Sequence, residues 1–192
     1  MAKARKSAIA TVLVALVFCL VTVVAQEHGK EKGGQSEVYP QLKPGPETEK
    51  LGFQLGTWKT VEKHEAMPGF AGGEGKGVMK VRTGPGGLSF ITEYNSAGVI
   101  GSFAGHGLTF WDAEAGIYKS YWLDSLTAGS MEMTGRWEGK ELVFTGTTKH
   151  MGKTYSMKEV ITDITPTSYT MRMYMGEGGA EALVMTLRLT KQ

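Results

Sequence analysis

The sequence predicts an all-β fold, an antiparallel up-and-down β-barrel of about ten strands with one short N-terminal helix. Three observations predict it. After Gly56, apolar and polar residues alternate with a period of two. Turn-forming residues recur about every ten positions, and the links between alternating segments are too short for crossover helices. A meander of this many strands avoids exposed edges most simply by closing on itself.

The N-terminus has the pattern of an export signal. Basic residues near the start precede an apolar run at residues 8–24, and Val23 and Ala25 occupy the positions where signal peptidase requires small or short branched side chains. We therefore expect residues 1–25 to be a signal peptide and the mature chain to begin near Gln26. This predicts an exported protein, either periplasmic or secreted.

Cys19, the only cysteine, lies inside this expected signal. The mature domain would then have neither a disulfide nor a thiolate metal site, and no metal ligand is predicted. Two alternatives stay open. The apolar run is just long enough to remain as an uncleaved membrane anchor, and Cys19 would be a lipid attachment site if the bulky Phe18 before it were tolerated.

Composition limits the partners and the number of domains. The formal net charge is +2, and no block of basic residues is interleaved with aromatic ones, so we expect no nucleic-acid partner. Residues 26–45 are polar and rich in Gly, Lys and Glu, which predicts a flexible tether. Residues 46–192 are long enough for one barrel domain with a core of its own.

A short helix is expected before the first strand. Pro46 suits the first helical position, and Glu47 suits the positive end of the helix. Leu51 and Leu55 share one face, and Gly56 is placed to end the helix.

Ten strands are expected after this helix. They are predicted at residues 57–65, 74–82, 88–95, 102–111, 117–124, 130–137, 141–149, 154–164, 168–175 and 182–190. The connecting segments contain Gly, Pro, Ser and Asp and are short enough for hairpins, so neighbours in sequence should pair antiparallel.

Methionine dominates the face predicted to point into the barrel. The period of two places these residues there: Met131, Met133, Trp137, Tyr169, Met171, Met173, Met175, Leu183, Met185, Leu187 and Leu189. Thioether side chains adapt to irregular apolar shapes, including a bound hydrophobic molecule. A barrel of this size either packs solid or keeps a cavity, and both alternatives stay open. The ligand-binding candidates on this face are Met131, Met133, Trp137, Tyr169, Met171, Met173 and Met185.

Two further residues are candidates for a cavity. His106 lies between Gly105 and Gly107, which would let a ligand or another backbone approach closely, although a lone strand histidine is more often only hydrogen-bonded. The long connection at residues 66–73 carries Phe70, which would either lie in a lid over the barrel mouth or plug the barrel end.

No local motif assigns a catalytic residue. The sequence lacks a phosphate-binding loop, a zinc-protease helix and a Gly-x-Ser-x-Gly elbow. An enzyme would need a site assembled from distant strands, for which the remaining titratable candidates are His64, His150, Glu93, Asp112 and Asp124. We expect both aspartates to act instead as turn residues that bond local backbone.

Gly56-Thr57-Trp58 after a short helix, together with Arg188 on the last strand, resembles the calycin superfamily of lipocalin-like barrels. The resemblance implies that Trp58 and Arg188 form a structural clasp at the closed end. With Trp111-Asp112 and Trp122-x-Asp124-Ser125, the chain is similar to a family of exported bacterial proteins classed as a domain of unknown function. That family implies a calycin-like barrel and supplies no activity.

The function expected from these observations is binding of a small hydrophobic molecule by an exported, non-enzymatic barrel. The sequence does not identify the ligand or a cofactor. Related nitrobindin-like barrels bind haem through a histidine, and the resemblance does not assign His106 or His150 to that ligand position. Two other functions stay open: an isomerase or hydrolase acting on a lipophilic substrate, and a structural or interaction role in the cell envelope.

Overall fold

The computed structural model describes residues 41–150, 152–177 and 180–192. The expected export signal, Cys19 and residues 26–40 of the expected tether lie outside these ranges. Among the described residues, no helix is both long and apolar enough to cross a membrane.

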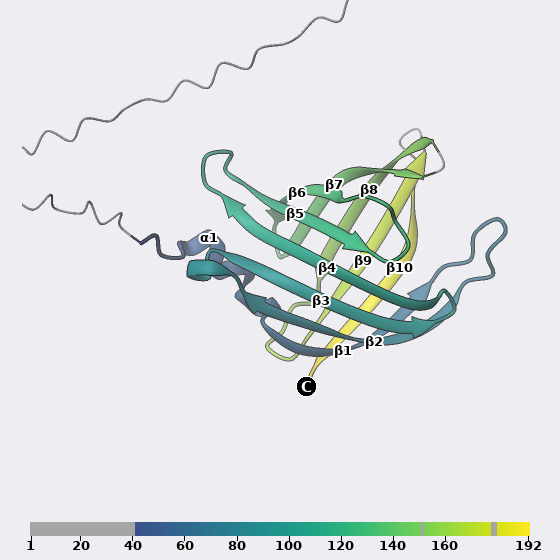
Figure 1. The fold of residues 1–192 in the computed structure, drawn as a ribbon, viewed down its shortest axis with the longest axis horizontal. Helices are drawn as coiled ribbons and strands as arrows, with labels where there is room; N and C mark the ends of the chain where they lie inside the picture. Colours follow the sequence, from purple (N-terminus) through teal and green to yellow (C-terminus); the bar gives the residue numbers. More distant parts are fainter. Residues whose placement is uncertain (1–40, 151, 178–179) are drawn as a thin grey trace, which may run out of the picture. The chain divides into compact units, whose positions relative to one another are not determined.

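Ten antiparallel strands form a closed barrel (Figure 1). Each strand pairs with its neighbours in sequence, and β1 also pairs with β10, which closes the sheet. The strands are β1 (Gly56–His64), β2 (Gly73–Thr83), β3 (Ser89–Gly98), β4 (Gly101–Asp112), β5 (Ile117–Asp124), β6 (Met131–Glu138), β7 (Glu141–His150), β8 (Lys153–Thr162), β9 (Ser168–Glu177) and β10 (Ala180–Lys191). The predicted all-β barrel is confirmed, with each strand at its expected place.

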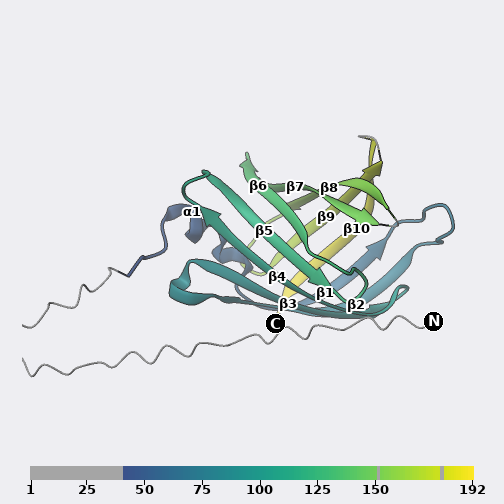
Figure 2. The ribbon, with the colours of Figure 1, turned by 45° about the horizontal axis from the view of Figure 1, so that its top comes forward.

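A short helical segment covers one end of the barrel (Figure 2). It consists of α1 (Pro46–Glu49) and a 3₁₀ helix, η1 (Lys50–Gln54), so the predicted helix tightens after one turn. Leu51 is fully buried. The Tyr118 hydroxyl donates a hydrogen bond to Glu47 Oε2 at 2.7 Å, which joins α1 to β5. A second 3₁₀ turn, η2 (Pro85–Gly87), links β2 to β3.

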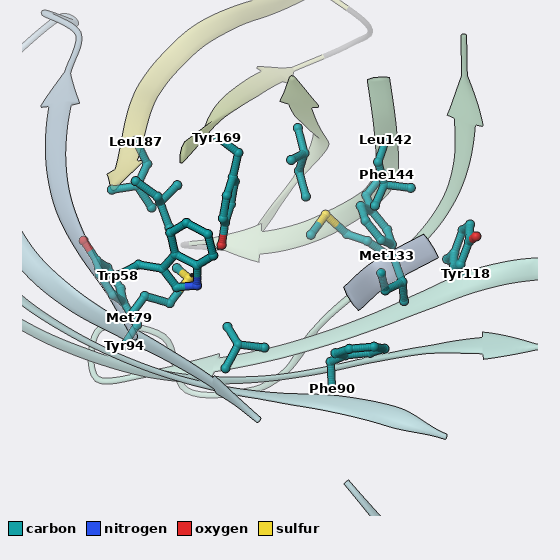
Figure 3. Close-up of a cluster of buried hydrophobic side chains, with 14 of the residues drawn as sticks. Trp58, Met79, Phe90, Tyr94, Tyr118, Met133, Leu142, Phe144, Tyr169 and Leu187 are labelled. Atoms are coloured by element: carbon teal, nitrogen blue, oxygen red, sulfur yellow. Dashed lines mark hydrogen bonds between the residues drawn. The ribbon is translucent and has the colours of Figure 1, made fainter. Parts of the chain in front are cut away.

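Strand alternation builds the core inside the barrel. Residues that lie directly opposite each other on paired strands face the same side of the sheet. Trp58 pairs with Met79, and Met79 pairs with Tyr94, so the three side chains face inward together. Figure 3 shows these side chains with Tyr169 and Leu187 in one part of the core, and Met133, Leu142 and Phe144 in another.

The predicted alternation on β10 is wrong at one position. The register shifts between Leu183 and Met185, so Leu183 pairs with Tyr174 while Met185 pairs with Met173. Tyr174 lies on the outer wall beneath Lys158, whose Nζ is 4.8 Å from the ring centroid. Because a bulge inserts one extra residue, it turns every side chain beyond it to the opposite face. Leu183 therefore faces outward, whereas Met185, Leu187 and Leu189 face inward as expected.

Candidate functional site

The barrel encloses a cavity of about 230 Å³. Six methionines line it: Met79, Met131, Met133, Met171, Met173 and Met185. All of these except Met79 were predicted candidates. The thioether groups come from β2, β6, β9 and β10, so they surround the space rather than cover one side of it.

Aromatic rings form another part of the wall. Trp122 stacks on Phe103 with ring centroids 6.4 Å apart and an angle of 11° between the planes. The ring of Phe103 also packs against that of Tyr94, with centroids 5.9 Å apart. All three residues line the cavity. The cavity therefore presents flat π faces next to flexible thioethers, both of which suit an apolar ligand.

Two predicted candidates lie beside the cavity rather than in its wall. Tyr169 is buried, and its ring meets Trp58 edge to face at 4.8 Å. Trp137 donates its Nε1 hydrogen to the Tyr118 hydroxyl at 3.2 Å. These residues belong to the core packed against η1, since Phe53 contacts both rings.

Phe70 lies near the rim. Its ring meets the ring of His64 edge to face, with centroids 6.4 Å apart, and His64 itself lines the cavity. Phe70 is partly buried and is paired with Met67 through an isolated β-bridge. The lid role of residues 66–73 stays a prediction.

His106 lies on the outer wall, which corrects its expected place in the cavity. Its side chain is exposed, and it is paired with Glu93 and Leu123, which are also exposed. The neighbouring Gly105 and Gly107 face inward. A Cβ at Gly105 would lie 2.2 Å from Trp122 Cζ2, so the glycine makes room for the indole ring rather than for a ligand of His106.

The expected clasp uses another residue. Trp58 pairs with Lys191, whose Nζ lies 5.2 Å from the centroid of the indole ring. Arg188 pairs with Val61, and both side chains are exposed on the outer wall. The basic residue over Trp58 is therefore Lys191, because Arg188 is three residues away and has the opposite parity in the strand.

The remaining titratable candidates have structural surroundings. Asp112 Oδ1 accepts hydrogen bonds from the backbone of Glu114 and Ala115, which is the expected turn role. Asp124 caps the turn after β5 through Leu126 N at 2.8 Å, and it also lines the cavity. The side chain of His150 is outside the described part of the molecule.

Glu62 forms a buried polar network that was not predicted. It is 2% exposed, accepts a hydrogen bond from the Tyr94 hydroxyl, and lies 3.0 Å from His64 Nε2. The Tyr94 hydroxyl is also 3.1 Å from Thr60 Oγ1. Burial raises the pKa of Glu62, but the Ser96 and Tyr94 hydroxyls and the His64 ring lower it by more, so the carboxyl group is ionised at neutral pH.

The glycines of β2 make room for this network. Gly75 pairs directly with Glu62, and a Cβ there would lie 2.5 Å from Glu62 Oε2. A Cβ at Gly77 would lie 2.9 Å from Thr60 Oγ1. Gly75 therefore makes room for the Glu62 carboxylate, and Gly77 makes room for Thr60, which contacts Tyr94 in the same network.

Glu159 also lines the cavity, and its carboxyl group has different surroundings from those of Glu62 and Asp124. It pairs with Phe144 on one side and Met173 on the other, so it faces inward among apolar neighbours. Within the described residues, no hydrogen bond or ion pair satisfies it. Burial raises the pKa of Glu159 to about 7. A carboxyl group of this kind exchanges its proton near neutral pH.

Gln54, at the end of η1, adds an unpaired donor. The residue is 9% exposed and lines the cavity. In the described structure its Nε2 has no hydrogen-bond partner. An orphaned buried amide donor costs about 1–3 kcal/mol.

Sequence reasoning missed Glu62, Glu159 and Gln54. The alternation used for the methionines also places Glu62 inward with Trp58 and Thr60, and Glu159 inward with Met157 and Ile161. That signal was present in the sequence for both carboxyl groups. No strand pattern covers Gln54, because it lies in a 3₁₀ turn.

The outer wall carries an apolar surface across three strands. Ile91, Leu108 and Tyr121 lie directly opposite one another on β3, β4 and β5, and Tyr121 stacks on Phe110 with ring planes 9° apart. Leu123 extends this surface and is 54% exposed. Contiguous exposed apolar side chains are typical of interaction surfaces.

Comparisons with solved structures match the barrel to known folds. Rv2717c from M. tuberculosis has a TM-score of 0.57 at 13% identity, over 77% of this chain and 98% of that chain. The S-type phycobiliprotein lyase CPES from Guillardia theta has a TM-score of 0.52 at 12% identity, over 75% and 91% of the two chains. At these identities the likeness shows the fold alone, and it fits the calycin-like barrel that the resemblance implied.

Comparisons of the sequence identify a family. No curated protein matches the chain. A family model described as "Protein of unknown function (DUF1579)" matches residues 43–191, which include the helix and all ten strands. The chain therefore belongs to the DUF1579 family.

Proposed function

We propose that this protein is an exported barrel that binds a small, mostly apolar molecule in its central cavity. The observation that carries the proposal is the cavity itself, with six methionines and two stacked aromatic rings in its wall. The pattern of residues 1–25 supports export. The volume of about 230 Å³ lies just below the usual range for drug-sized ligands, so the ligand is small.

The polar groups in the wall indicate that the cavity is a binding site and not a gap left by incomplete packing of the core. A solid core would be expected to satisfy or exclude its polar atoms, since an unpaired buried group is costly. Glu159 instead faces the cavity without a hydrogen-bond or ion-pair partner among the described residues, and Gln54, another lining residue, has an unpaired Nε2. Unsatisfied polar groups beside an open apolar space are what a ligand with a few polar atoms would complete.

The test fills the cavity with a protein side chain. Thr109 lines the cavity on β4, and its neighbour Leu108 faces outward on the same strand. Thr109→Phe is expected to weaken binding of 2-phenylethanol at least about tenfold, because the new ring occupies the space. Titration calorimetry and ligand-observed NMR measure the affinity.

Leu108→Phe is the matched control, because it adds a ring of the same kind outside the barrel. It should bind 2-phenylethanol as the unmodified protein does. The proposal would be wrong if the unmodified protein bound none of the probe, or if both variants lost affinity equally.

A second candidate function, proton-transfer catalysis, is favoured by Glu159 alone. A carboxylate with a pKa of about 7 in an apolar cavity is suited to accept a proton from the carbon beside a ketone carbonyl and to return it. In D₂O, phenylacetone would then exchange its α-hydrogens for deuterium about 10²-fold faster with the protein than with Glu159→Gln. NMR follows the exchange, and equal rates for the two proteins would exclude this function.

A further inference from the structure

The charge of the cavity wall specifies the ligand further. Its ionisable side chains include the carboxyl groups of Glu62, Asp124 and Glu159, whereas none of the described residues that line it is Lys or Arg. Among the described lining residues the one histidine is His64, and it is within hydrogen-bond distance of Glu62. The wall is therefore acidic, and a ligand anion would meet repulsion without a compensating partner.

The three carboxyl groups are not equivalent. Glu62 accepts hydrogen bonds from Tyr94 and lies within hydrogen-bond distance of His64. Asp124 accepts bonds from the Trp122 indole at 3.2 Å and from two backbone amides. Of the three carboxyl groups, only that of Glu159 lacks such partners among the residues described. A ligand with a positive charge or a hydrogen-bond donor would stabilise its ionised form.

The rest of the wall also favours a cation with an apolar body. Trp122, Phe103 and Tyr94 are grouped on one side of the cavity, where their rings offer contact area to the apolar body. Thioether sulfur provides a polarizable surface for the apolar part.

We infer that the cavity takes a small apolar amine, whose ammonium group pairs with the carboxylate of Glu159 while its apolar part lies among the methionine and aromatic side chains. The inference rests on the proposed function and names its ligand class. A pair between a charged amine and a carboxylate inside an apolar wall is stronger than the same pair in water.

The pairing predicts a pH dependence. Burial raises the pKa of Glu159 to about 7, so the carboxyl group of the empty protein is mostly neutral at pH 6 and mostly ionised at pH 8. Amine affinity should therefore rise about tenfold from pH 6 to pH 8. In the described part of the chain, the other titratable groups that line the cavity are Glu62, His64, Tyr94 and Asp124, and Tyr169 is buried beside it.

The experiment compares three probes of similar size at pH 8: phenethylamine, 2-phenylethanol and phenylacetate. Calorimetry should show phenethylamine binding at least about tenfold more tightly than 2-phenylethanol, with phenylacetate the weakest. Glu159→Gln should bind the amine and the alcohol equally. It should also lose the rise in amine affinity between pH 6 and pH 8.

Glu93→Gln is the matched control, because Glu93 is exposed on the outer wall and the substitution changes the net charge equally. It should keep both the amine preference and the pH dependence. A preference or pH dependence that persists in Glu159→Gln would assign the effect to His64 or to the aromatic wall and would contradict the inference.

The two proposals fail in different ways. If the alcohol binds as tightly as the amine, or phenylacetate binds best, the amine inference is wrong and the small-molecule function stands. If none of the three probes binds to the unmodified protein, both proposals are wrong. Thermal unfolding of each variant checks that a lost affinity does not come from a lost fold.

Discussion

Replacing Trp58 with alanine is expected to lower the free energy of unfolding by about 3–5 kcal/mol. The indole is fully buried, and its ring meets Tyr169 at 4.8 Å. Its Nε1 donates to the carbonyl oxygen of Gln54 at 2.7 Å, so one side chain joins β1, β9 and η1. The alanine variant loses this packing and leaves the Gln54 carbonyl without its donor. Chemical denaturation followed by circular dichroism measures the loss.

Trp58→Phe separates the ring from the hydrogen bond. It keeps most of the apolar packing and removes only the donor and part of the ring, so a smaller loss, about 1–3 kcal/mol, is expected. If alanine cost less than about 1 kcal/mol, the end of the barrel at η1 would not depend on this residue. If the two variants cost the same, the hydrogen bond rather than packing would be the main contribution.

Replacing Glu159 with glutamine is expected to stabilise the protein at high pH by up to about 3 kcal/mol and to change little at low pH. The folded pKa of Glu159, about 7, lies above its usual value of 4.5, because burial disfavours the ionised form. Below pH 4.5 the carboxyl group is protonated in both folded and unfolded chains, so it contributes no difference. Glutamine resembles this protonated form and is never ionised.

The direction of this pH dependence follows from proton binding by the folded and unfolded chains. Between pH 4.5 and about 7 the folded chain holds a proton that the unfolded chain releases, so the stability of the unmodified protein falls relative to Glu159→Gln. Above about pH 7 the folded state carries a buried charge, and the difference between the two proteins is complete. Denaturant titrations of both proteins at pH 4.5, 6 and 8 measure it.

Glu93→Gln is again the control, since its exposed side chain should give no comparable difference across the same pH range. A constant difference between Glu159→Gln and the unmodified protein would show that Glu159 does not face the apolar interior as the structure places it. A larger stability of the unmodified protein at pH 8 would show that the carboxylate has a positive partner inside the barrel.

Much of the architecture was predictable because it depends on local spacing. The strand boundaries followed from alternation and from Gly-containing turns, and antiparallel pairing followed from the short links. The inward direction of Met131, Met133, Met171, Met173 and Met185 followed from the same period. A bulge has no such signal, which is why Leu183 was placed on the wrong face.

The candidate site was only partly predictable. The glycines that flank His106 predicted a close approach by a ligand. In the structure they make room for the indole ring of Trp122, which lies on another strand. Lys191 rather than Arg188 covers Trp58, because register decides which residue lies opposite. Glu62 and Glu159 have the same inward period as the apolar residues of their strands. They were not predicted because only apolar side chains were assigned to the interior.

The sequence by itself determined the class of fold, the number of strands and the apolar character of the interior, because these depend on spacing within short segments. Only the tertiary structure decided that a cavity remains, that Glu62 has partners and that, among the described residues, the Glu159 carboxyl group and Gln54 Nε2 have none. Those properties depend on distances between side chains of strands far apart in the chain, and a period of two contains no information about such distances.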